Sequence, residues 1–538
     1  MPQLAANRPP PADYYAENLR YVLGHVRLYY ADVLMPQEHA FAESVLACSA
    51  AAQRLFARLI GRKGPWIRVD KVNYAEVDDL ESSLDELHLA ELISINNPAP
   101  ADALLGLLTN PERAQLFPNV AASSKPQWIE RCVSGHSDAY ISQRIARQFP
   151  WVCVRPYQIF TLYQLLFFGD THQDLSTFVL EDLGMLRYER YELTPEHRQF
   201  ADRAQLDRYL YLRALNALSH RVEEMPTLAP SLAHALRINT RSRLEARVRD
   251  RACNRLGRWH ERRDESAAAL DCYASSTSHP ARERSARVLQ RLGDQVGVEK
   301  LLCLMRSAPR SAEEEDFAER FGAPRQRSVI PTTEYQIVGA VPREIEQYAI
   351  DTLTADRGRG WHLENRFSLG IAGLAFWPVV FADIPGAFVN PFQSAPVDLG
   401  WPDFLAPRAD LFEAHVELLH DEQRFVEFVR RTSLEKRGVA NRLVSWRHFD
   451  EKLLDAVLSA IPATALLSLG QFVLENLHRL RTGFPDLLIV YGPGEYEFVE
   501  VKGPTDQLQP GQRIWFKALA RLQLPARVVK FKTSGAGL

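Results

Sequence analysis

Cysteine is scarce in this chain of 538 residues, and the six that occur are scattered without any CxxC pair. Neither a zinc-binding module nor a disulfide framework is therefore expected. No apolar segment follows Met1, and the apolar run from Gly370 to Phe381 is short and interrupted by Pro378. A membrane-spanning helix needs about 20 apolar residues in a row. We therefore expect a cytoplasmic protein with no membrane partner.

Motifs for several other chemistries are also missing. The sequence contains no GxxxxGK[ST] loop, no HExxH and no GxSxG, so P-loop ATP hydrolysis, zinc proteolysis and α/β-hydrolase chemistry are not indicated. The net charge is only −3, so any affinity for nucleic acid must come from local basic surfaces. With 46% hydrophobic and 24% charged residues, the chain has the composition of a globular protein of about three or four domains.

Two strand-like segments near the C-terminus, residues 484–491 and 496–504, carry the clearest chemical pattern. Both are rich in β-branched and aromatic residues, and Gly492-Pro493-Gly494-Glu495 between them is typical of a tight reversal. This pattern predicts a β-hairpin. If the connection holds an odd number of residues, Asp486 is expected to lie opposite Lys502.

Three ionisable side chains of this hairpin are candidates for a catalytic centre. Side chains two apart on a strand share a face, so Glu500 and Lys502 lie together with Asp486 while Val501 faces the other way. The two carboxylates and the backbone carbonyl of Val501 are hard oxygen ligands of the kind that Mg²⁺ or Mn²⁺ prefers. Lys502 can orient or deprotonate an attacking water and offset charge on a phosphate. The alternative is an exposed Glu/Lys pair on an ordinary hairpin.

Glu364 is a fourth candidate, at the predicted start of a helix. The apolar face of that helix is formed by Leu363, Phe367, Ile371, Leu374 and Phe381. From the residues alone, Glu364 is either a carboxylate that stabilises the N-terminus of the helix or a metal ligand.

The residues around these candidates follow the order of a known family. They are Pro485-Asp486, Glu500-Val501-Lys502-Gly503-Pro504, Asp506-x-Leu508 and Gln512-x-x-Trp515-Phe516. Together they resemble the VRR-NUC branch of the PD-(D/E)xK nucleases. The segment from Gly360 to Leu399 is similar to the corresponding part of the Fanconi-associated nuclease family, with Glu364 at its acidic position, and the similarity extends along nearly the whole chain.

The resemblance implies a multidomain fold whose N-terminal two-thirds are mainly α-helical and whose C-terminal part is an α/β PD-(D/E)xK nuclease domain. We expect an N-terminal helical or winged DNA-binding region in residues 1–96 and a SAP-like DNA-binding domain in 97–220. A TPR-like helical domain in 221–332 and the VRR-NUC domain in 333–538 follow. Within this plan, the composition of residues 311–331 predicts a mobile connector.

The resemblance also implies roles for single residues. Glu364, Asp486 and Glu500 are expected to be catalytic and, with Val501, to hold Mg²⁺ or Mn²⁺; Lys502 is expected to be catalytic. Arg62 and Tyr74 match an arginine and a tyrosine that are implicated in holding a 5′ phosphate, and both side chains can donate hydrogen bonds to phosphate oxygens. Arg62 is alternatively a surface residue at the end of a helix.

A row of arginines predicts a second nucleic-acid-binding surface. Arg243, Arg247, Arg251 and Arg255 recur at four-residue steps and would form one stripe of a helix. A DNA-tracking surface is one interpretation. The other is a solvated helix face whose charge is neutralised by acids from other elements.

The resemblance implies a structure-selective 5′ flap endonuclease and 5′ to 3′ exonuclease that functions in interstrand crosslink repair. The expected partner is branched or flapped double-stranded DNA with a 5′ end, bound by a monomer, which in a bacterium would be associated with the nucleoid. The Cys/His spacing of the ubiquitin-binding zinc finger of eukaryotic members is missing. Two alternatives remain open: a non-catalytic helical scaffold with a degenerate nuclease fold, and a nuclease acting on RNA.

Overall fold

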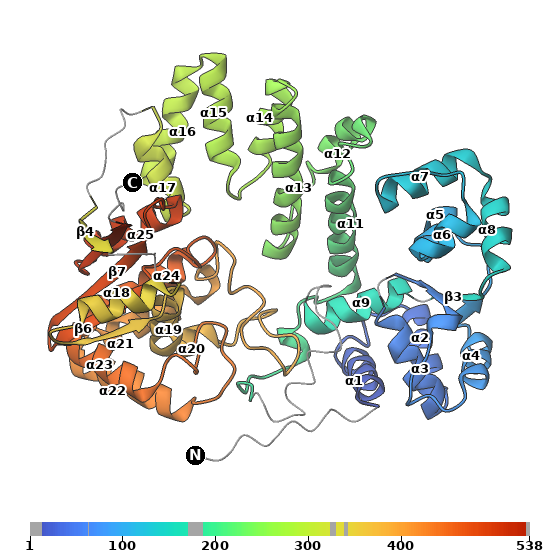
Figure 1. Cartoon of the computed structure of the whole chain (residues 1–538), viewed down its shortest axis with the longest axis horizontal. Coiled ribbons are helices and arrows are strands. Elements are labelled where there is room, and N and C mark those ends of the chain that lie inside the picture. Colours follow the sequence, from blue (N-terminus) through green and yellow to red (C-terminus); the bar gives the residue numbers. More distant parts are fainter. Residues whose placement is uncertain are drawn as a thin grey trace. The chain divides into compact units, whose positions relative to one another are not determined.

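The computed structural model describes residues 13–62, 64–155, 157–169, 187–322, 330–337 and 343–533. The chain divides into two compact units (Figure 1). Unit 1 consists of Met1–Arg187, Glu192–Arg203 and Val389–Phe392, and unit 2 of Tyr188–Tyr191, Ala204–Phe388 and Gln393–Leu538.

Unit 1 combines two groups of helices with a small antiparallel sheet. The first group is α1 (Tyr14–Tyr29), α2 (Pro36–Ala47), α3 (Ala50–Ile60) and α4 (Leu80–Leu89), and the second is α5 (Ala101–Gly106), α6 (Asn110–Leu116), α7 (Lys125–Gly135) and α8 (Asp138–Ala146). The sheet has the order β1 (Trp66–Arg68), β3 (Trp151–Val154), β2 (Ile93–Ile95), and α9 (Tyr157–Phe168) follows β3. The second group encloses its own core around Trp128 and Ile141. This second group of helices therefore has a hydrophobic core of its own.

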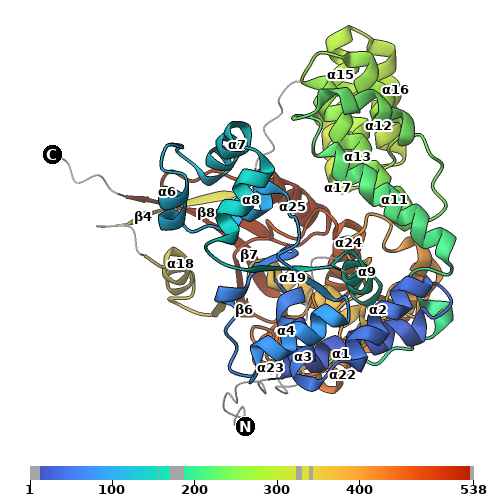
Figure 2. The same cartoon turned by 90° about the vertical axis from the view of Figure 1, so that its right-hand side faces the viewer.

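Unit 2 begins with an array of helices (Figures 1 and 2), in which each helix from the second to the last contacts the next one along the chain. They are α11 (Arg203–Ser219), α12 (Ala229–Ala235), α13 (Arg243–Glu261), α14 (Ser266–Ala274), α15 (Ala281–Leu292), α16 (Gln295–Ser307) and α17 (Ala312–Arg320). Gly257 allows α13 and α14 to approach closely, because a Cβ there would lie 2.6 Å from the Tyr273 ring. The array lies largely in residues 221–332, and that its helices are TPR-like pairs stays a prediction.

Helix α17 corrects one expectation from the sequence. Residues 311–331 were expected to be a connector, but Ala312–Arg320 is a helix whose N-cap Ser311 accepts a hydrogen bond from the Glu314 N–H. The acidic run that suggests a solvated connector instead occupies the first turn of α17, where negative charge is stabilised by the helix dipole.

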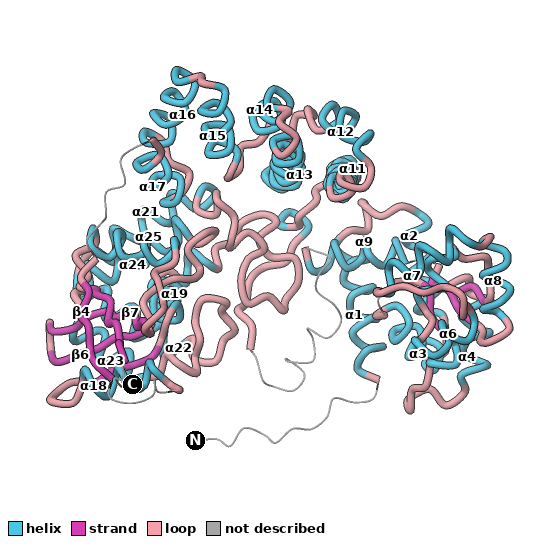
Figure 3. The backbone as a smooth tube through the Cα atoms, turned by 45° about the horizontal axis from the view of Figure 1, so that its top comes forward, coloured by secondary structure: helices cyan, strands magenta, loops and turns pink. Residues whose placement is uncertain are grey.

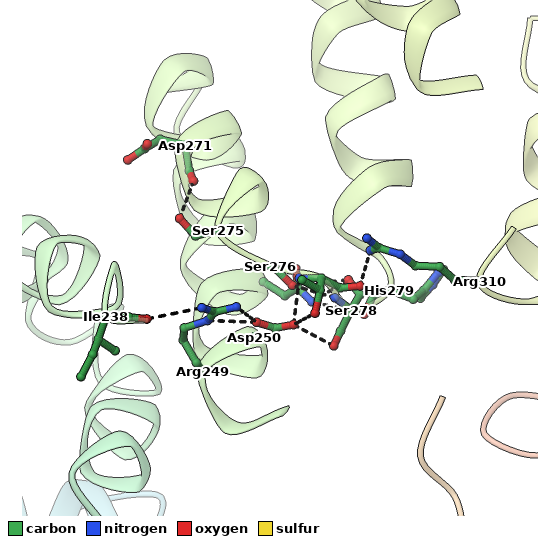
Figure 4. Close-up of polar contacts among 11 residues, drawn as sticks. Ile238, Arg249, Asp250, Asp271, Ser275, Ser276, Ser278, His279 and Arg310 are labelled. Atoms are coloured by element: carbon green, nitrogen blue, oxygen red, sulfur yellow. Dashed lines mark hydrogen bonds and ion pairs between the residues drawn. The ribbon is translucent and has the colours of Figure 1, made fainter. Parts of the chain in front are cut away.

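Asp250 ties α13 to the turn that joins α14 and α15 (Figure 4). This fully buried carboxylate accepts hydrogen bonds from the Thr277 N–H (2.8 Å), the Thr277 hydroxyl (2.7 Å) and the Ser278 hydroxyl (3.0 Å). Its other oxygen accepts from the Arg249 guanidinium at 2.9 Å. Removing a buried carboxylate with this many donors is costly. The network therefore fixes the position of α13 relative to the turn between α14 and α15.

The C-terminal part of unit 2 is an α/β region built around a five-stranded sheet (Figure 3). The strands lie in the order β4 (Thr332–Ile337), β8 (Ala526–Thr533), β7 (Glu495–Lys502), β6 (Leu487–Gly492) and β5 (Arg359–His362). Strand β8 is parallel to both of its neighbours, whereas β6 is antiparallel to both β5 and β7. The region completes the predicted fold class, a mainly helical chain with a C-terminal α/β domain.

Helices cover both faces of this sheet. The larger core includes Phe367, Leu466, Leu488, Phe498 and Trp515, and the smaller core lies under α18. The helices are α18 (Ile345–Leu353), α19 (Asn365–Ala375), α20 (Trp377–Val380), α21 (Ala409–Leu419), α22 (Glu422–Glu435), α23 (Glu451–Ala460), α24 (Ala463–Asn476) and α25 (Pro510–Arg521).

Among the residues that the structure describes, no single helix is long and apolar enough to cross a membrane. Helices α23 and α24 reach that length and composition only as a pair, which is bent by 113°.

Candidate active site

Strands β6 and β7 form the predicted hairpin, but in a different register. Leu488 lies opposite Phe498, and the same register continued outward places Asp486 beside Glu500, not beside Lys502 as expected. The reversal is tighter than expected because only Pro493 and Gly494 separate the paired ends of the strands, with Gly494 at φ 72° and an irregularity in the pairing after Val490. Since the shift is two residues and the side-chain period is two, the carboxylates and Lys502 still share one face.

Asp486 is held just before β6 by contacts from both neighbouring strands. Its Oδ2 accepts a hydrogen bond from the Val501 N–H at 2.9 Å. Its backbone carbonyl accepts from the N–H groups of Leu363 (2.9 Å) and Glu364 (3.0 Å), which follow β5. Burial raises the pKa of the Asp486 carboxyl, and the Val501 N–H and the charge of Lys502 partly offset this.

Glu500 is the most deeply buried of the candidate residues, with 1% of its surface exposed. Its Oε1 contacts Lys502 Nζ at 2.9 Å and accepts a hydrogen bond from Gln512 Nε2 at 2.5 Å. Its Oε2 is buried without a hydrogen-bond partner among the described residues. Burial, followed by repulsion from Asp486, raises the pKa of Glu500 to about 7. An oxygen left in this state is costly unless a further group binds it.

Glu364 occupies the N-cap position of α19, but its side chain makes no capping hydrogen bond. Its backbone has φ 48° and ψ −138°, a region that residues with a Cβ rarely adopt. Glu364 therefore does not cap α19 through a side-chain hydrogen bond, although its charge still lies at the N-terminus of the helix. The hydrogen bond from the Glu364 N–H to the Asp486 carbonyl places Glu364 beside the hairpin.

Sequence reasoning missed two residues of this site, His362 and Gln512. The ligand atoms of His362, Glu364 and Asp486 all lie within 4.8 Å of one another, and His362 Nε2 is 3.3 Å from Glu364 Oε1. The spacing of His362 and Glu364, two residues apart at the end of a strand, is the signal that could have found the histidine. Gln512 belongs to the quoted family pattern, and the structure gives it a task, since it orients Glu500.

The donor set fits a divalent cation. Carboxylate oxygens of Glu364 and Asp486 converge, and a buried, unpartnered oxygen of Glu500 is available on the same face of the sheet. Glu500 is not part of the convergent group, and Lys502 and Gln512 hold its other oxygen. Hard oxygen donors of this kind match Mg²⁺ or Mn²⁺.

The predicted phosphate-binding pair lies in unit 1, and the structure brings its members together. Arg62 Nε donates to the Tyr74 hydroxyl at 2.9 Å, and Arg62 Nη2 donates to the Lys71 carbonyl at 3.2 Å. Both side chains are partly exposed, so each can still contact a ligand.

Two of the four arginines in the predicted stripe, Arg243 and Arg255, make polar contacts with neighbouring elements. Helix α13 forms as predicted, but Arg243 contacts Asp403 and lies 3.4 Å from Asp398. Arg255 donates to the Ser219 hydroxyl at 2.6 Å. These two arginines contact neighbouring elements, and that they also bind phosphate stays a prediction.

Arg247 and Arg251 make no hydrogen bond or ion pair among the described residues, although Arg247 lies over the Trp401 ring at 5.1 Å. Burial, then the charge of Arg251, lowers the pKa of Arg247 to about 10, and Arg481 contributes to the same effect. Burial, followed by the charge of Arg442, lowers the pKa of Arg481. Positively charged side chains of α13 and of the loops of the α/β region therefore lie close to one another. The sequence did not indicate this cluster of arginines.

Comparison with known proteins places these features in a family. The family model described as "VRR-NUC domain" matches residues 421–532. The family model described as "FAN1, HTH domain" matches residues 13–94. A Fanconi-associated nuclease 1 homolog from Pseudomonas aeruginosa is 32% identical, with 98% of this chain and 97% of that protein covered.

Two solved structures resemble the whole chain. The crystal structure of paFAN1 bound to 2-nt 5′ flap DNA with a gap has a TM-score of 0.83 at 29% identity and covers 99% of this chain and 100% of that one. The complex of paFAN1 with 1-nt 5′ flap DNA with a gap has a TM-score of 0.77 at 28% identity, with 97% and 99% covered.

Proposed function

The chain belongs to the Fanconi-associated nuclease family and is a hydrolase of phosphodiesters; on that premise, we propose that it is a metal-dependent nuclease that cleaves DNA near 5′ flaps. The observation that carries this proposal is the buried, unpartnered Oε2 of Glu500 on the sheet face shared with Asp486 and Lys502.

The proposed metal ligands are Glu364, Asp486, Glu500 and the backbone carbonyl of Val501. A bound Mg²⁺ or Mn²⁺ would supply Lewis-acid stabilisation of the phosphate and acidify a water molecule. The hydrogen bond from the Val501 N–H orients the Asp486 carboxylate, and Gln512 orients that of Glu500. These contacts keep the two carboxylates in place without the ion.

We propose that the positively charged side chain of Lys502 takes part in catalysis together with the metal ion. Its ammonium lies 2.9 Å from Glu500 Oε1 and is largely buried. A positive charge in a low-dielectric site stabilises the additional negative charge of the phosphate in the transition state more effectively than it would in water. In the same position, the ammonium can hydrogen-bond and orient an attacking water.

The DNA is proposed to reach this site along basic surfaces of unit 2. Arg247 and Arg251 of α13, with Arg481 and Arg442 of the α/β region, are available for phosphate oxygens, since mutual repulsion of like charges favours binding of an anion. Arg62 and Tyr74 of unit 1 are proposed to contact a 5′ phosphate.

The choice of flapped DNA draws on the paFAN1 structures, which contain 5′ flap DNA. By family membership, we also propose 5′ to 3′ exonuclease activity and a role in interstrand crosslink repair. Action as a monomer in the cytoplasm is a further part of the proposal. RNA remains the alternative substrate, because phosphate contacts alone do not distinguish the two nucleic acids.

The test is cleavage of a labelled 5′ flap, compared with nicked duplex, single-stranded DNA and RNA of the same sequence, in Mg²⁺, Mn²⁺ or EDTA. The proposal expects flap cleavage with either cation, none in EDTA, and slower reaction of the other substrates. Equal rates in EDTA would overturn metal dependence, and preferred cleavage of RNA would reassign the substrate.

A further inference from the structure

We propose that His362 is a nitrogen ligand of the cation and makes the site favour first-row transition-metal ions, Mn²⁺ among them, over Mg²⁺. This inference rests on the proposed function, since it concerns the same metal site. It adds an imidazole to a ligand set that would otherwise consist of oxygen atoms only.

The backbone places His362 at the site independently of its side chain. His362 is the last residue of β5 and pairs with Leu487 of β6, the residue that follows Asp486. The two residues after His362 both donate their N–H groups to the Asp486 carbonyl. These bonds fix the segment that carries His362 and Glu364 against the start of β6, so the three side chains converge because of the sheet register.

The spacing of the three ligand atoms fits one ion. Those of His362, Glu364 and Asp486 lie within 4.8 Å of one another. Two ligands at about 2.1–2.2 Å from an ion are at most about 4.3 Å apart, so only small side-chain movements are needed. The carboxylate of Glu364 is the one ion-pair partner of the imidazole in the described part of the chain, at 3.3 Å from Nε2.

The exposure of His362 suits a ligand more than a structural residue. Its side chain is 41% exposed, and that of Glu364 is 43% exposed, so an ion from solvent can reach both. His448, which lies close enough to His362 for an electrostatic interaction, is by contrast engaged with the Ser445 hydroxyl at 2.9 Å. His448 therefore offers a matched control for the loss of a histidine close to the site.

Imidazole nitrogen discriminates between cations in a way that carboxylate oxygen does not. Mg²⁺ is a hard ion that takes oxygen ligands and keeps several waters, whereas first-row transition metals bind imidazole more readily. One nitrogen among oxygen ligands therefore raises the affinity for Mn²⁺ more than that for Mg²⁺.

The test measures metal binding directly, with Mn²⁺ alone as the probe and the full-length protein without DNA. Electron spin-echo spectroscopy of bound Mn²⁺ should show modulation from a coordinated ¹⁴N in the wild type and in His448→Asn. The modulation should be lost in His362→Asn. Calorimetric titration should show that His362→Asn binds Mn²⁺ at least about tenfold more weakly than the wild type. Loss of a residue that only hydrogen-bonds to a metal ligand already lowers metal affinity by about tenfold or more. Mg²⁺ affinity should change little.

The outcomes separate this inference from the proposed function. If the wild type binds Mn²⁺ without nitrogen modulation, or if His362→Asn retains the modulation, the assignment of His362 is overturned while the metal site stands. If the wild type binds no Mn²⁺ and Asp486→Asn behaves identically, the metal site itself is wrong. Thermal unfolding of His362→Asn is the control for its fold. If the unfolding curve matches that of the wild type, the loss of Mn²⁺ affinity results from the missing imidazole and not from a change in the fold.

Discussion

Glu364 combines a proposed functional carboxylate with an unfavourable backbone conformation, φ 48° and ψ −138°. Such a conformation costs on the order of 1–3 kcal/mol in a residue with a Cβ and is tolerated by glycine. We predict that Glu364→Gly is more stable than Glu364→Ala by about 1 kcal/mol, although both lose cleavage activity. Urea unfolding of the two variants measures this difference. Equal stabilities would mean that the backbone of Glu364 is not strained in solution.

Glu500 gives a prediction for the metal-free protein. Its pKa is raised from 4.5 to about 7, mainly by burial, so the folded state holds a proton that the unfolded state releases at lower pH. The stability of the wild type in EDTA should therefore fall, relative to Glu500→Gln, as the pH rises from about 4.5 to 7, and level off above that. The difference should be on the order of 1–3 kcal/mol.

Urea unfolding at several pH values, in EDTA, measures this effect. Parallel stability profiles of the wild type and Glu500→Gln would contradict the raised pKa. Saturating Mn²⁺ should restore the stability of the wild type alone, because an ion that binds only the folded state stabilises it.

The four arginines of α13 differ in their contacts, and their four-residue spacing alone does not reveal this difference. Arg243 and Arg255 hold the helix in place, whereas Arg247 and Arg251 are available to a ligand. We predict that replacing Arg247 and Arg251 with Gln weakens DNA binding and flattens its salt dependence by up to roughly two units of slope, about 0.9 per lost phosphate contact. Fluorescence anisotropy at a series of salt concentrations measures both quantities.

A matched control is Arg306→Gln on α16, which removes a partly exposed arginine paired with Glu299 and should leave the slope unchanged. Arg243→Gln should instead lower stability, because it leaves the buried Asp398 with one arginine fewer. An unchanged salt slope in the Arg247/Arg251 double variant would exclude α13 from the DNA path.

The elements also show which features the sequence could predict. The hairpin and the shared face of Asp486, Glu500 and Lys502 follow from strand composition and period-two geometry. The register does not follow, because it depends on how few residues the reversal takes. Acids from residues 398–403 neutralise Arg243 through contacts more than 150 positions away in sequence, and no local pattern contains such information. His362 was missed because its two-residue spacing from Glu364 is a weak signal by itself, and Asp486 lies beside the two residues only in the folded chain.

For the whole molecule, unit 1 is expected to determine which DNA end is preferred. Arg62 and Tyr74 form a pair with exposed surface, and by the family resemblance they hold a 5′ phosphate. We predict that Arg62→Ala lowers the ratio of cleavage rates on phosphorylated and hydroxyl 5′ flaps, because a charge-assisted contact to the phosphate is lost. Arg147→Ala, an exposed arginine after α8, serves as the control. An unaltered ratio in Arg62→Ala would leave Arg62 as a surface residue.

The central claim, that a cation held by the hairpin carboxylates performs cleavage, is tested most directly with Asp486→Ala. Single-turnover cleavage of a labelled 5′ flap in Mn²⁺ is measured together with the affinity for the same DNA in EDTA. The metal-site account predicts no product above background, while the affinity for DNA stays within a few-fold of that of the wild type. The reason is that the carboxylate binds the metal ion and does not contact the DNA. Cleavage at the wild-type rate would contradict it.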